Sequence, residues 1–484
     1  MAEILKKIND VRQKKIEIQG FTFGHVIPSA RKVPLVVPDF ENGIVICEIK
    51  RGSPSAGVIG EIKNPVELAG NYISGGAGVI SVLTEEDHFF GSLNDLMDVK
   101  NKYPNACILR KDFIQYEEEM DITYRAGADM VLLIVASYND CDASRSHLKK
   151  LYDKAIAVGL TPLVETHNED EINVALGIGA KVIGINTRDL KTFVIDRNKA
   201  YYLKKMLPEG VYSIYESGIR SSYEGYLAGS GGFKGILVGT SLVKDASPKK
   251  AVSELVKNYT CGLKNQRSFF QSIFTAIYSG NKPVVKICGI TTVEDAEKAI
   301  HSGADIVGFV MADSKRKVSY ETVETICKAI GNRAFKVAVV TDFSEDAIRL
   351  VNERVIDAIQ FHGFLQTEDE LKKVTYPWYR AVNMSEISDY PKESMSPFIL
   401  IDAFSEEKGG SGKRIDDHLV NEVTELTGNH LCIAGGITPE NAGEIIKKYK
   451  PDIIDLSSGV ESEPGIKNHK RIEQLFEEIK RSKE

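Results

Sequence analysis

The stretch MVLLIVASYNDCDASRSHLKKLYDKAIAVGLTPLVE (residues 130–165) decides the fold. It opens with an apolar run, MVLLIVA, continues through a helical stretch that ends near a glycine, and closes with a second apolar run, LTPLVE. Short apolar runs separated by a helix-length segment are typical of two parallel strands joined by a helix. The stretch therefore predicts a β/α unit of a parallel sheet.

The same unit recurs in both directions along the chain. The runs of the first half are 44–49, 79–83, 106–110, 130–136, 160–165, 181–186, 211–216 and 235–239. A second set follows after residue 282, at 284–288, 305–311, 335–340, 356–361, 376–382, 397–402, 431–436 and 452–457. Eight parallel strands close into a filled barrel in about 250 residues, so the sequence predicts an α/β protein of two (β/α)8 TIM barrels in tandem.

Two further features bear on the domain organisation. A doubly wound open sheet is the alternative fold, but its first turn usually carries GxGxxG, which is absent. The segment 258–282 contains no ninth strand, is rich in aromatic residues and ends in the turn signal SGNKP. We therefore expect a first domain at 1–257, a packed helical linker at 258–282 and a second domain at 283–484.

Composition excludes several classes of function. A net charge of −7 argues against a nucleic-acid-binding protein, since phosphodiester backbones require clustered Lys and Arg. No apolar run approaches the length of a membrane span. The seven cysteines are scattered without a CxxC pair, which indicates a reducing cytoplasm and no zinc site. We expect a cytoplasmic monomer that uses no metal.

Polar residues end many of the apolar runs in the first half. They are Glu48, Lys50, Lys111, Glu165, Asn186, Glu216 and Ser217. In a TIM barrel the C-terminal ends of the strands share one mouth, where neighbouring acids and amines shift one another's pKa values. These residues are therefore candidates for general acid/base chemistry. The alternative, that each is an ordinary solvated residue, weakens because every one of them ends an apolar run.

Glycine pairs recur near the end of both halves. ESGI (216–219) precedes LVGTSLV (237–243), and AGGI (434–437) precedes LSSGVE (456–461). Small residues after strands 7 and 8 of a barrel let backbone N–H groups approach a phosphate closely. Each half is therefore expected to bind one phosphate monoester, although tight turns alone would also require glycine.

Seven blocks span the first half: CEIKRGSPSAG (47–57), LRKDF (109–113), GADMVLLI (127–134), LVETHN (163–168), GINTRDL (184–190), ESGI (216–219) and LVGTSLV (237–243). Together they resemble the indole-3-glycerol-phosphate synthase family. The resemblance implies closure of the indole ring of an anthranilate-bearing deoxyribulose phosphate, with loss of carbon dioxide and water. By the same resemblance Lys111 is the general acid, Lys50 holds the substrate carboxylate and Glu165 is the base. It further implies that Glu48, Asn186 and Glu216 orient these groups, and that Ser53, Ser217, Gly218, Gly239 and Thr240 bind the substrate and its phosphate.

Lys111 poses a chemical requirement. Lysine is a poor acid at its ordinary pKa of about 10.4, so the mouth has to destabilise its charge through burial or a second cation. We expect Lys50 to be that cation and to lower the pKa of Lys111.

A second set of blocks spans the second half: KICGIT (286–291), GFVMADSKRKV (308–318), QFHG (360–363), LIDAF (400–404), GGSGK (409–413), AGGIT (434–438) and DLSSGVE (455–461). Together they resemble the phosphoribosylanthranilate isomerase family. The implied reaction is an Amadori rearrangement of N-phosphoribosyl anthranilate, which yields the ketone that the first half consumes. The resemblance makes Cys288 the base, provided that its surroundings favour the thiolate, and Asp402 the acid. It assigns Arg316 to the substrate carboxylate and Gly410, Ser411, Gly436, Ser458 and Gly459 to the phosphate.

The sequence departs from these families at a few positions and leaves other functions open. Thr187 stands where the synthases usually have Asn, and the second half has GGSGKRID and GIKNHK in place of the usual motifs. These changes put substrate contacts in the loops in doubt, not proton transfer. The alternatives are an aldolase or sugar-phosphate epimerase pair with Lys111 as Schiff-base lysine, and a non-catalytic protein that binds phosphorylated metabolites. Neither reaction implied by the resemblance requires a cofactor.

Overall fold

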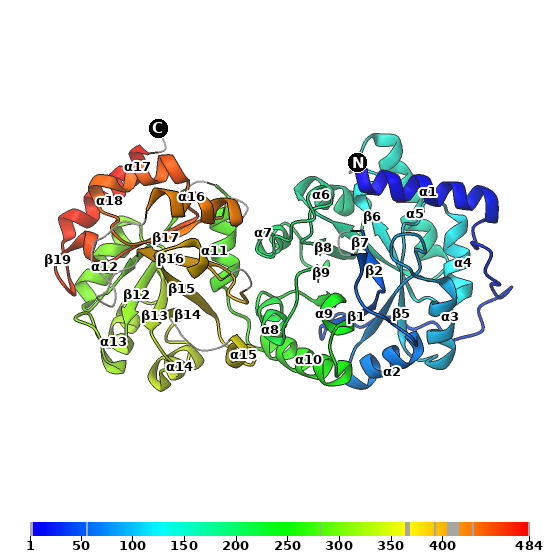
Figure 1. Ribbon diagram of the computed structural model, residues 1–484, viewed down its shortest axis with the longest axis horizontal. Coiled ribbons are helices and arrows are strands. Elements are labelled where there is room, and N and C mark those ends of the chain that lie inside the picture. Colours follow the sequence, from blue (N-terminus) through cyan, green and yellow to red (C-terminus); the bar gives the residue numbers. More distant parts are fainter. Residues whose placement is uncertain are drawn as a thin grey trace. The chain divides into compact units, whose positions relative to one another are not determined.

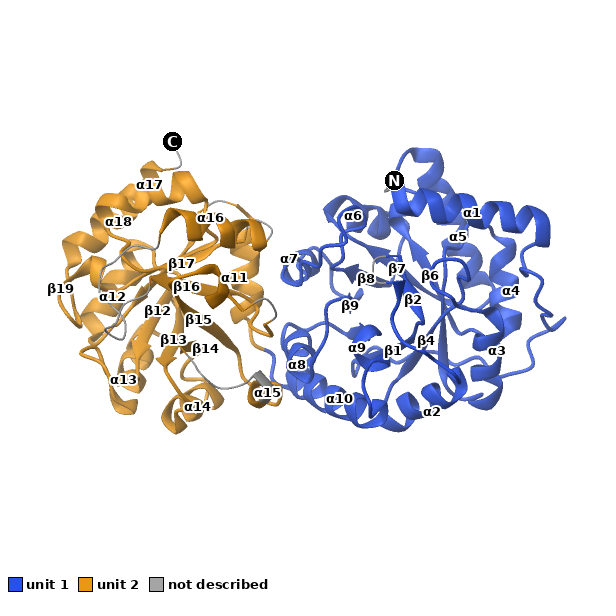
Figure 2. Ribbon diagram, viewed as in Figure 1, with its two compact units in different colours: residues 1–266 blue, residues 267–484 orange. Residues whose placement is uncertain are grey.

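Strands and helices alternate along the chain, and each half of the sequence closes its own barrel (Figure 1). The computed structural model describes residues 3–54, 57–280, 282–363, 368–391, 394–403, 416–427 and 430–482. Its contacts divide the chain into two units, residues 1–266 and 267–484 (Figure 2). The predicted pair of (β/α)8 barrels is confirmed.

The first barrel contains eight parallel strands. They are β1 (Ile44–Ile49), β4 (Val79–Leu83), β5 (Cys107–Lys111), β6 (Met130–Ile134), β7 (Thr161–Thr166), β8 (Val182–Asn186), β9 (Tyr212–Glu216) and β10 (Gly235–Val238). β1 pairs with both β4 and β10, which closes the sheet. The bounds differ from the predicted runs by one or two residues; β6 ends at Ile134 because Val135–Ser137 turn into a 3-10 helix.

Alternation along the strands builds two apolar layers. In β6, Met130 and Leu132 pack with Leu109, Leu163 and residues of other strands. Val131 and Leu133 face outward and join a second cluster with residues of the surrounding helices. Successive side chains of a strand point to opposite faces, so a parallel strand buried on both faces reads as a continuous apolar run.

Helices surround this barrel. They are α2 (Pro65–Gly75), α3 (Leu93–Lys102), α4 (Glu118–Ala126), α5 (Asp142–Ala157), α6 (Glu169–Gly177), α7 (Lys199–Lys204), α8 (Ser222–Ser230), the single turn α9 (Thr240–Val243) and α10 (Pro248–Lys264). α10 packs on α8 and α2 and so belongs to the first unit. The expected linker therefore includes the end of α10, and residue 257 lies inside that helix.

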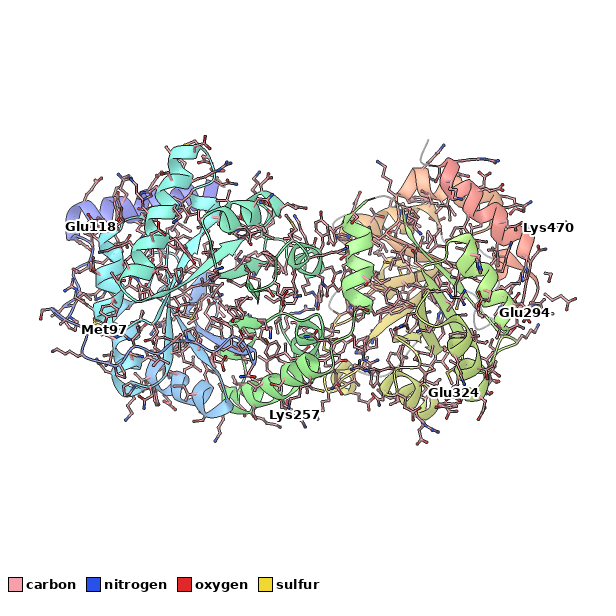
Figure 3. The ribbon with its side chains drawn as sticks, turned by 180° about the vertical axis from the view of Figure 1, so that it is seen from behind. Met97, Glu118, Lys257, Glu294, Glu324 and Lys470 are labelled. Atoms are coloured by element: carbon pink, nitrogen blue, oxygen red, sulfur yellow. The ribbon has the colours of Figure 1, made fainter. Side chains whose placement is uncertain are left out.

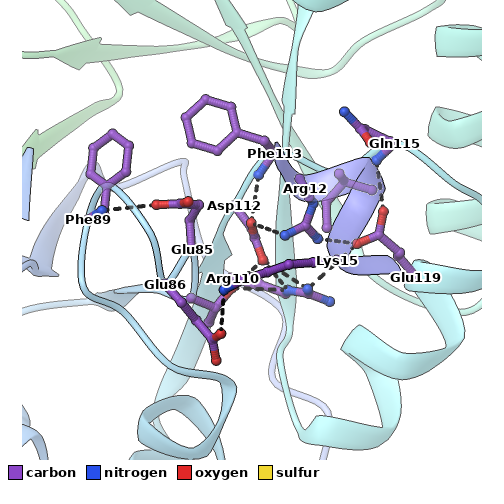
Figure 4. A network of polar contacts seen from close by, with 12 residues as sticks. Arg12, Lys15, Glu85, Glu86, Phe89, Arg110, Asp112, Phe113, Gln115 and Glu119 are labelled. Carbon is purple, nitrogen blue, oxygen red and sulfur yellow. Dashed lines mark hydrogen bonds and ion pairs between the residues drawn. The ribbon is translucent and has the colours of Figure 1, made fainter. Parts of the chain in front are cut away.

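A helix that precedes the barrel, α1 (Glu3–Gln19), is fastened to the end of β5 by buried charges (Figure 4). Arg12 of α1 donates to Asp112 Oδ1 at 2.7 Å and also to Glu119 of α4. Arg110 donates to the other oxygen of Asp112 at 2.9 Å. Asp112 directly follows Lys111, so this network, which we call the α1 clamp, holds the backbone beside a predicted catalytic residue.

The second barrel repeats the pattern. Its strands are β11 (Val284–Cys288), β12 (Ile306–Val310), β13 (Phe335–Val340), β14 (Ala358–His362), β15 (Trp378–Met384), β16 (Ile399–Ala403), β17 (Cys432–Ala434) and β18 (Ile453–Leu456). The helices described are α11 (Phe269–Tyr278), α12 (Val293–Ser302), α13 (Tyr320–Ile330), α14 (Glu345–Asn352), α15 (Glu368–Leu371), α16 (Asp417–Leu426), α17 (Pro439–Tyr449) and α18 (His469–Arg481). β11 pairs with both β12 and β18.

The helix α11 contributes aromatic side chains to the second unit. Phe269 lies edge-on to Phe335 at the start of β13 and stacked with Tyr379 of β15. Phe270 and Phe274 both contact Phe398, the residue before β16. These are the N-terminal ends of the strands, so α11 packs at the end of the barrel opposite its mouth.

The outer helices present charge to solvent. Figure 3 labels exposed side chains such as Glu118 of α4, Lys257 of α10 and Glu324 of α13. Among the described residues, no helix has both the length and the apolar character that a bilayer crossing requires.

Candidate active sites

The ends of β5, β7 and β9 bring three charged side chains together in the mouth of the first barrel. Lys111 Nζ donates to Glu165 Oε2 at 2.6 Å and to Glu216 Oε2 at 2.9 Å. All three side chains are largely buried, and the Oε1 atom of Glu216 has no hydrogen-bond partner in the described part of the chain. Residues far apart in the sequence thus form one hydrogen-bonded cluster of the kind that acid/base chemistry requires.

The electrostatics of this cluster contradict the expectation for Lys111. Burial lowers the pKa of Lys111, but the charges of Glu165, Glu216 and Glu48 outweigh it, and the net pKa is raised. Lys50 does not act as the expected opposing cation, because its ammonium pairs with Glu48 Oε1 at 2.7 Å. The prediction of a lowered Lys111 pKa was therefore wrong.

The pKa values of the two glutamates around Lys111 shift in opposite directions. Burial raises the pKa of Glu165, but Lys111 and His167 oppose this and the net pKa lies well below the ordinary value. Burial raises the pKa of Glu216 to about 8, with Glu165 adding to the shift and Lys111 opposing it. At neutral pH one carboxyl is therefore ionised and its neighbour holds a proton. Such a division marks out acid and base roles in a shared site.

The strand ends also carry the other predicted residues of the first barrel. Ser217 Oγ donates to Asn186 Oδ1 at 2.8 Å, which links the ends of β8 and β9. Ser217 and Gly218 both have positive φ, at 68° and 84°. This conformation favours glycine, and at position 218 a Cβ atom would also lie only 2.8 Å from the side chain of Arg197.

The predicted phosphate contacts of the first barrel fall into two places. Gly239 and Thr240 lie where β10 ends and α9 begins, and a Cβ at Gly239 would come within 2.8 Å of Glu48 Oε1. Ser53 lies in β2 (Gly52–Ser53), which pairs with β3 (Gly57–Val58) beyond the end of β1. The main group, Gly218, Gly239 and Thr240, thus follows the seventh and eighth strands of the barrel.

A cavity of about 500 Å³ opens at the mouth of the second barrel. Its lining includes six predicted residues: Cys288, Arg316, Asp402, Gly436, Ser458 and Gly459. The predicted base and acid therefore face one space. Gly410 and Ser411 lie outside the described residues.

Cys288 lies above a buried polar network. Lys286, two residues earlier on β11 and 1% exposed, donates to Asp455 Oδ2 and Gln360 Oε1, both at 2.6 Å. Gly308 leaves room for this pair, since a Cβ there would lie 2.9 Å from both Cys288 Sγ and Lys286 Cε. Burial raises the pKa of the Cys288 thiol, whereas Lys286 acts in the opposite direction. Lys286 is thus a local cation that favours the thiolate, and Lys467 acts in the same direction, but the effect of burial is larger.

Asp402 and Arg316 face the cavity with different partners. Burial raises the pKa of Asp402, and His362 Nε2 lies 3.8 Å from its Oδ2 atom. Arg316 donates to both oxygens of Glu461, from Nε at 3.0 Å and from Nη2 at 2.7 Å. Glu461 also accepts from Lys467 at 2.7 Å. A carboxyl with a raised pKa and a guanidinium held by Glu461 therefore lie around one cavity.

Comparison with known families agrees with these two sites. The family model "Indole-3-glycerol phosphate synthase" matches residues 4–255, and "N-(5'phosphoribosyl)anthranilate (PRA) isomerase" matches residues 285–478. The chain belongs to the indole-3-glycerol phosphate synthase family and carries a PRA isomerase domain after it.

A "Multifunctional tryptophan biosynthesis protein" of Phycomyces blakesleeanus is 31% identical over 97% of this chain and 66% of the relative. A "Tryptophan biosynthesis protein TRP1" of Phytophthora nicotianae is 30% identical over 88% of this chain and 90% of that protein. The chain thus spans about two thirds of the length of the first relative. Among solved structures, a phosphoribosyl anthranilate isomerase from Thermus thermophilus aligns with 30% identity and a TM-score of 0.37, covering 41% of this chain and 98% of that one.

Sequence reasoning missed three residues at the sites of the synthase and isomerase domains. Arg188, two residues after Asn186, is half-buried; burial lowers its pKa, and the charge of Glu48 opposes this shift. His167 follows β7 beside Glu165, and Lys286 lies below Cys288. A polar residue inside an otherwise apolar run, as in VVKIC, was the signal for Lys286; the other two lie in loops, where polar residues are common.

Among the described residues, no three His, Cys, Asp or Glu side chains gather as ligands of a metal ion.

Proposed function

We propose that the chain catalyses two consecutive steps of tryptophan biosynthesis. The second barrel isomerises N-(5-phosphoribosyl)anthranilate to 1-(2-carboxyphenylamino)-1-deoxyribulose 5-phosphate. The first barrel closes the indole ring of that product, with loss of carbon dioxide and water, to give indole-3-glycerol phosphate. The observation that carries the proposal is the bonded cluster of Lys111, Glu165 and Glu216 in a barrel of the synthase family.

In the first barrel Lys111 donates the proton that ring closure needs. The arene carbon attacks the ketone, and the carbonyl oxygen takes the proton of Lys111 as the new carbon–carbon bond forms. Carbon dioxide then leaves and the arene regains its electron pair. Glu165, ionised and 2.6 Å from Lys111, accepts a proton during dehydration, while Glu216 retains its own at neutral pH. Lys50 holds the substrate carboxylate, and Glu48 and Asn186 orient the lysines and hydroxyls.

In the second barrel Asp402 and Cys288 act on opposite parts of the sugar. Asp402, whose raised pKa favours the protonated carboxyl, gives a proton to the furanose ring oxygen as the ring opens. The Cys288 thiolate removes the proton from the adjacent carbon, and the double bond shifts to form the enolamine and then the ketone. Arg316 binds the anthranilate carboxylate as a planar fork, and Gly410, Ser411, Gly436, Ser458 and Gly459 bind the phosphate.

The remaining assignments follow from this function. Ser53, Ser217, Gly218, Gly239 and Thr240 contact the substrate and phosphate of the first barrel. We assign the synthase to residues 1–257, the isomerase to 283–484 and the connection to 258–282, in a cytoplasmic monomer. A Schiff-base aldolase is not favoured, because a nucleophilic lysine has to lose its proton and the carboxylates around Lys111 raise its pKa.

The full-length chain tests the proposal directly. We expect it to consume phosphoribosyl anthranilate, formed in place from anthranilate, and to release indole-3-glycerol phosphate, followed by fluorescence. Supplied with the deoxyribulose phosphate alone, it should form the same product. A chain that binds these substrates without turning over either of them would refute the function and favour a metabolite-binding protein.

A further inference from the structure

His167 lies directly after β7, two residues beyond Glu165, and the start of α6 fixes its partner. Asn168 caps α6, accepting from the backbone N–H of Glu171 at 3.0 Å and donating to Glu171 Oε1 at 2.8 Å. The backbone N–H of His167 donates to Glu171 Oε2 at 2.8 Å. The Glu171 carboxylate therefore has one orientation, set by the first turn of the helix.

This carboxylate in turn orients the imidazole. His167 Nδ1 lies 2.9 Å from Glu171 Oε2, and because a carboxylate only accepts, Nδ1 carries a proton. The opposite nitrogen, Nε2, is buried and has no hydrogen-bond partner in the described part of the chain. It lies 3.5 Å from Glu165 Oε1. The unpartnered nitrogen therefore faces the oxygen of Glu165 that Lys111 does not occupy.

We propose that His167 is a positioning residue of the first barrel, which holds Glu165 in place and ionised while Lys111 gives up its proton. The inference rests on the proposed synthase function and adds to it a residue that contacts Glu165 from the side of the helix, away from Lys111. His167 does not touch the reacting atoms. It acts through Glu165 only.

The charges around Glu165 explain why a second cation matters. Lys111 on β5 lies on one side, at 2.6 Å, and Glu216 on β9 lies beyond it. His167 lies on the other side, with Glu171 of α6 behind it. When Lys111 loses its proton to the substrate, His167 is the cation that remains beside Glu165. Without it, Glu165 would tend to take up a proton itself and cease to be a base.

The protonation of His167 agrees with this role. Burial lowers the pKa of His167, but Glu165 and Glu171 outweigh it and raise the pKa to about 9. The imidazole is thus cationic at neutral pH. The separation of 3.5 Å from Glu165 is long for a hydrogen bond, and such bonds often shorten only when substrate binds.

The test compares His167→Gln with His25→Gln in the full-length chain. Glutamine retains a donor but has no charge. His25 is the matched control, because it is a histidine of the same unit whose Nε2 atom lies 2.9 Å from a carboxylate, Glu86, outside the cluster of Lys111, Glu165 and Glu216. For each variant, synthase kcat and KM are measured from acid to alkaline pH, with isomerase rate as the measure of intact protein.

We expect His167→Gln to lower synthase kcat about tenfold, as the loss of an orienting partner commonly does, with little change in KM. The acid limb of its kcat profile should move to higher pH, because Glu165 loses a neighbouring cation and becomes easier to protonate. His25→Gln should leave both features unchanged. An acid limb that stays in place in His167→Gln overturns the inference, whether or not kcat falls, since a purely structural cap of α6 would not shift it.

A second measurement does not depend on turnover. In the full-length chain labelled with 15N-histidine, both ring nitrogens of His167 should carry protons at neutral pH, and Glu165→Gln should lower the pH at which one is lost. A neutral His167 imidazole in the wild-type chain would also overturn the inference. A wild-type chain without any synthase turnover would instead refute the proposed function, so the two failures are distinguishable.

Discussion

At the residue scale, Lys111 is the proposed general acid of the first barrel, and its surroundings explain how it can be both charged and acidic. The carboxyl groups of Glu165, Glu216 and Glu48 together raise its pKa and so favour its protonated form. A bound substrate brings its own anionic groups, while the developing alkoxide is a far stronger proton acceptor than a carboxylate. The raised pKa therefore describes a loaded proton donor, and the cost of releasing the proton is offset when the ketone becomes an alkoxide.

Replacing Lys111 by alanine should abolish the synthase reaction and leave the isomerase reaction intact. General acid catalysis raises a rate by about 10²- to 10⁴-fold, so synthase kcat should fall by at least about 10²-fold. Steady-state assays with each substrate on the full-length variant measure both rates. The control is Lys257→Ala, an exposed lysine on α10. Near-normal synthase turnover in Lys111→Ala would contradict the assignment.

Lys286→Met addresses the base of the second barrel. Lys286 lowers the pKa of the Cys288 thiol, so its loss should raise that pKa and reduce the thiolate at neutral pH. Isomerase kcat should therefore fall at neutral pH and recover in part as the pH is raised. A kcat profile measured over pH, with synthase rate as control, gives the result; a profile that moves toward acid instead would contradict this role.

At the scale of elements, the α1 clamp ties the helix that precedes the barrel to the loop after β5. Asp112 accepts from Arg12, Arg110 and the hydroxyl of Thr84, and all of these side chains are buried. The carboxylate of Glu119 also accepts from the backbone N–H of Gln115 at 2.8 Å. The clamp thereby fixes both ends of the segment that follows Lys111.

Arg12→Leu should destabilise the first unit, because one oxygen of Asp112 loses its cation and Glu119 keeps only the more distant Arg110, at 3.7 Å. Removing one partner of a buried ion pair commonly costs about 3–5 kcal/mol. Urea unfolding followed by fluorescence and by loss of synthase activity measures the change, and Lys7→Leu on the exposed face of α1 is the control. Equal unfolding midpoints for the two variants would contradict the importance of the clamp.

The same clamp sets a dependence on pH. Burial raises the pKa of Asp112, but Arg12 and Arg110 outweigh it and the net pKa is lowered. Stability from this group is therefore fully present above the ordinary aspartate pKa of about 3.9 and is lost as the pH falls toward the lower folded value. The stability difference between wild type and Arg12→Leu should shrink in that acid window, as measured by urea unfolding at several pH values. A difference that stays constant through the window would assign the effect to packing instead of charge.

The elements were largely predictable from sequence, whereas their contacts were not. Apolar runs such as VISVL and VVKIC appear as strands with the predicted bounds, because burial on both faces of a parallel strand leaves a local signal. The pairing of Arg12 with Asp112 joins residues a hundred positions apart, so it leaves no local signal in the sequence. The direction of the Lys111 pKa shift depended on the carboxyl groups of three glutamates from other strands. For that reason the sequence-based expectation failed.

At the scale of the whole molecule, two barrels on one chain carry separate candidate sites, and in the proposed function the product of one is the substrate of the other. Among the described residues, Lys111, Glu165 and Glu216 of the first site belong to one unit, and Cys288, Asp402 and Arg316 of the second site belong to the other. We therefore expect each site to act independently of the other. Because both barrels belong to one chain, they are present in equal numbers. Fusion does not by itself transfer the intermediate from one barrel to the other.

Mixing two inactive variants tests this independence. Lys111→Ala retains the isomerase and Cys288→Ala retains the synthase, so an equimolar mixture should convert phosphoribosyl anthranilate to indole-3-glycerol phosphate. Because the intermediate has to diffuse between molecules, the mixture should show a lag and a transient pool of free deoxyribulose phosphate, measured by quenched-flow sampling. The wild-type chain should show the same lag if its sites exchange the intermediate through solvent, and a shorter one if the chain retains it. A mixture that forms no product would contradict independent sites, since each barrel would then require an intact partner on its own chain.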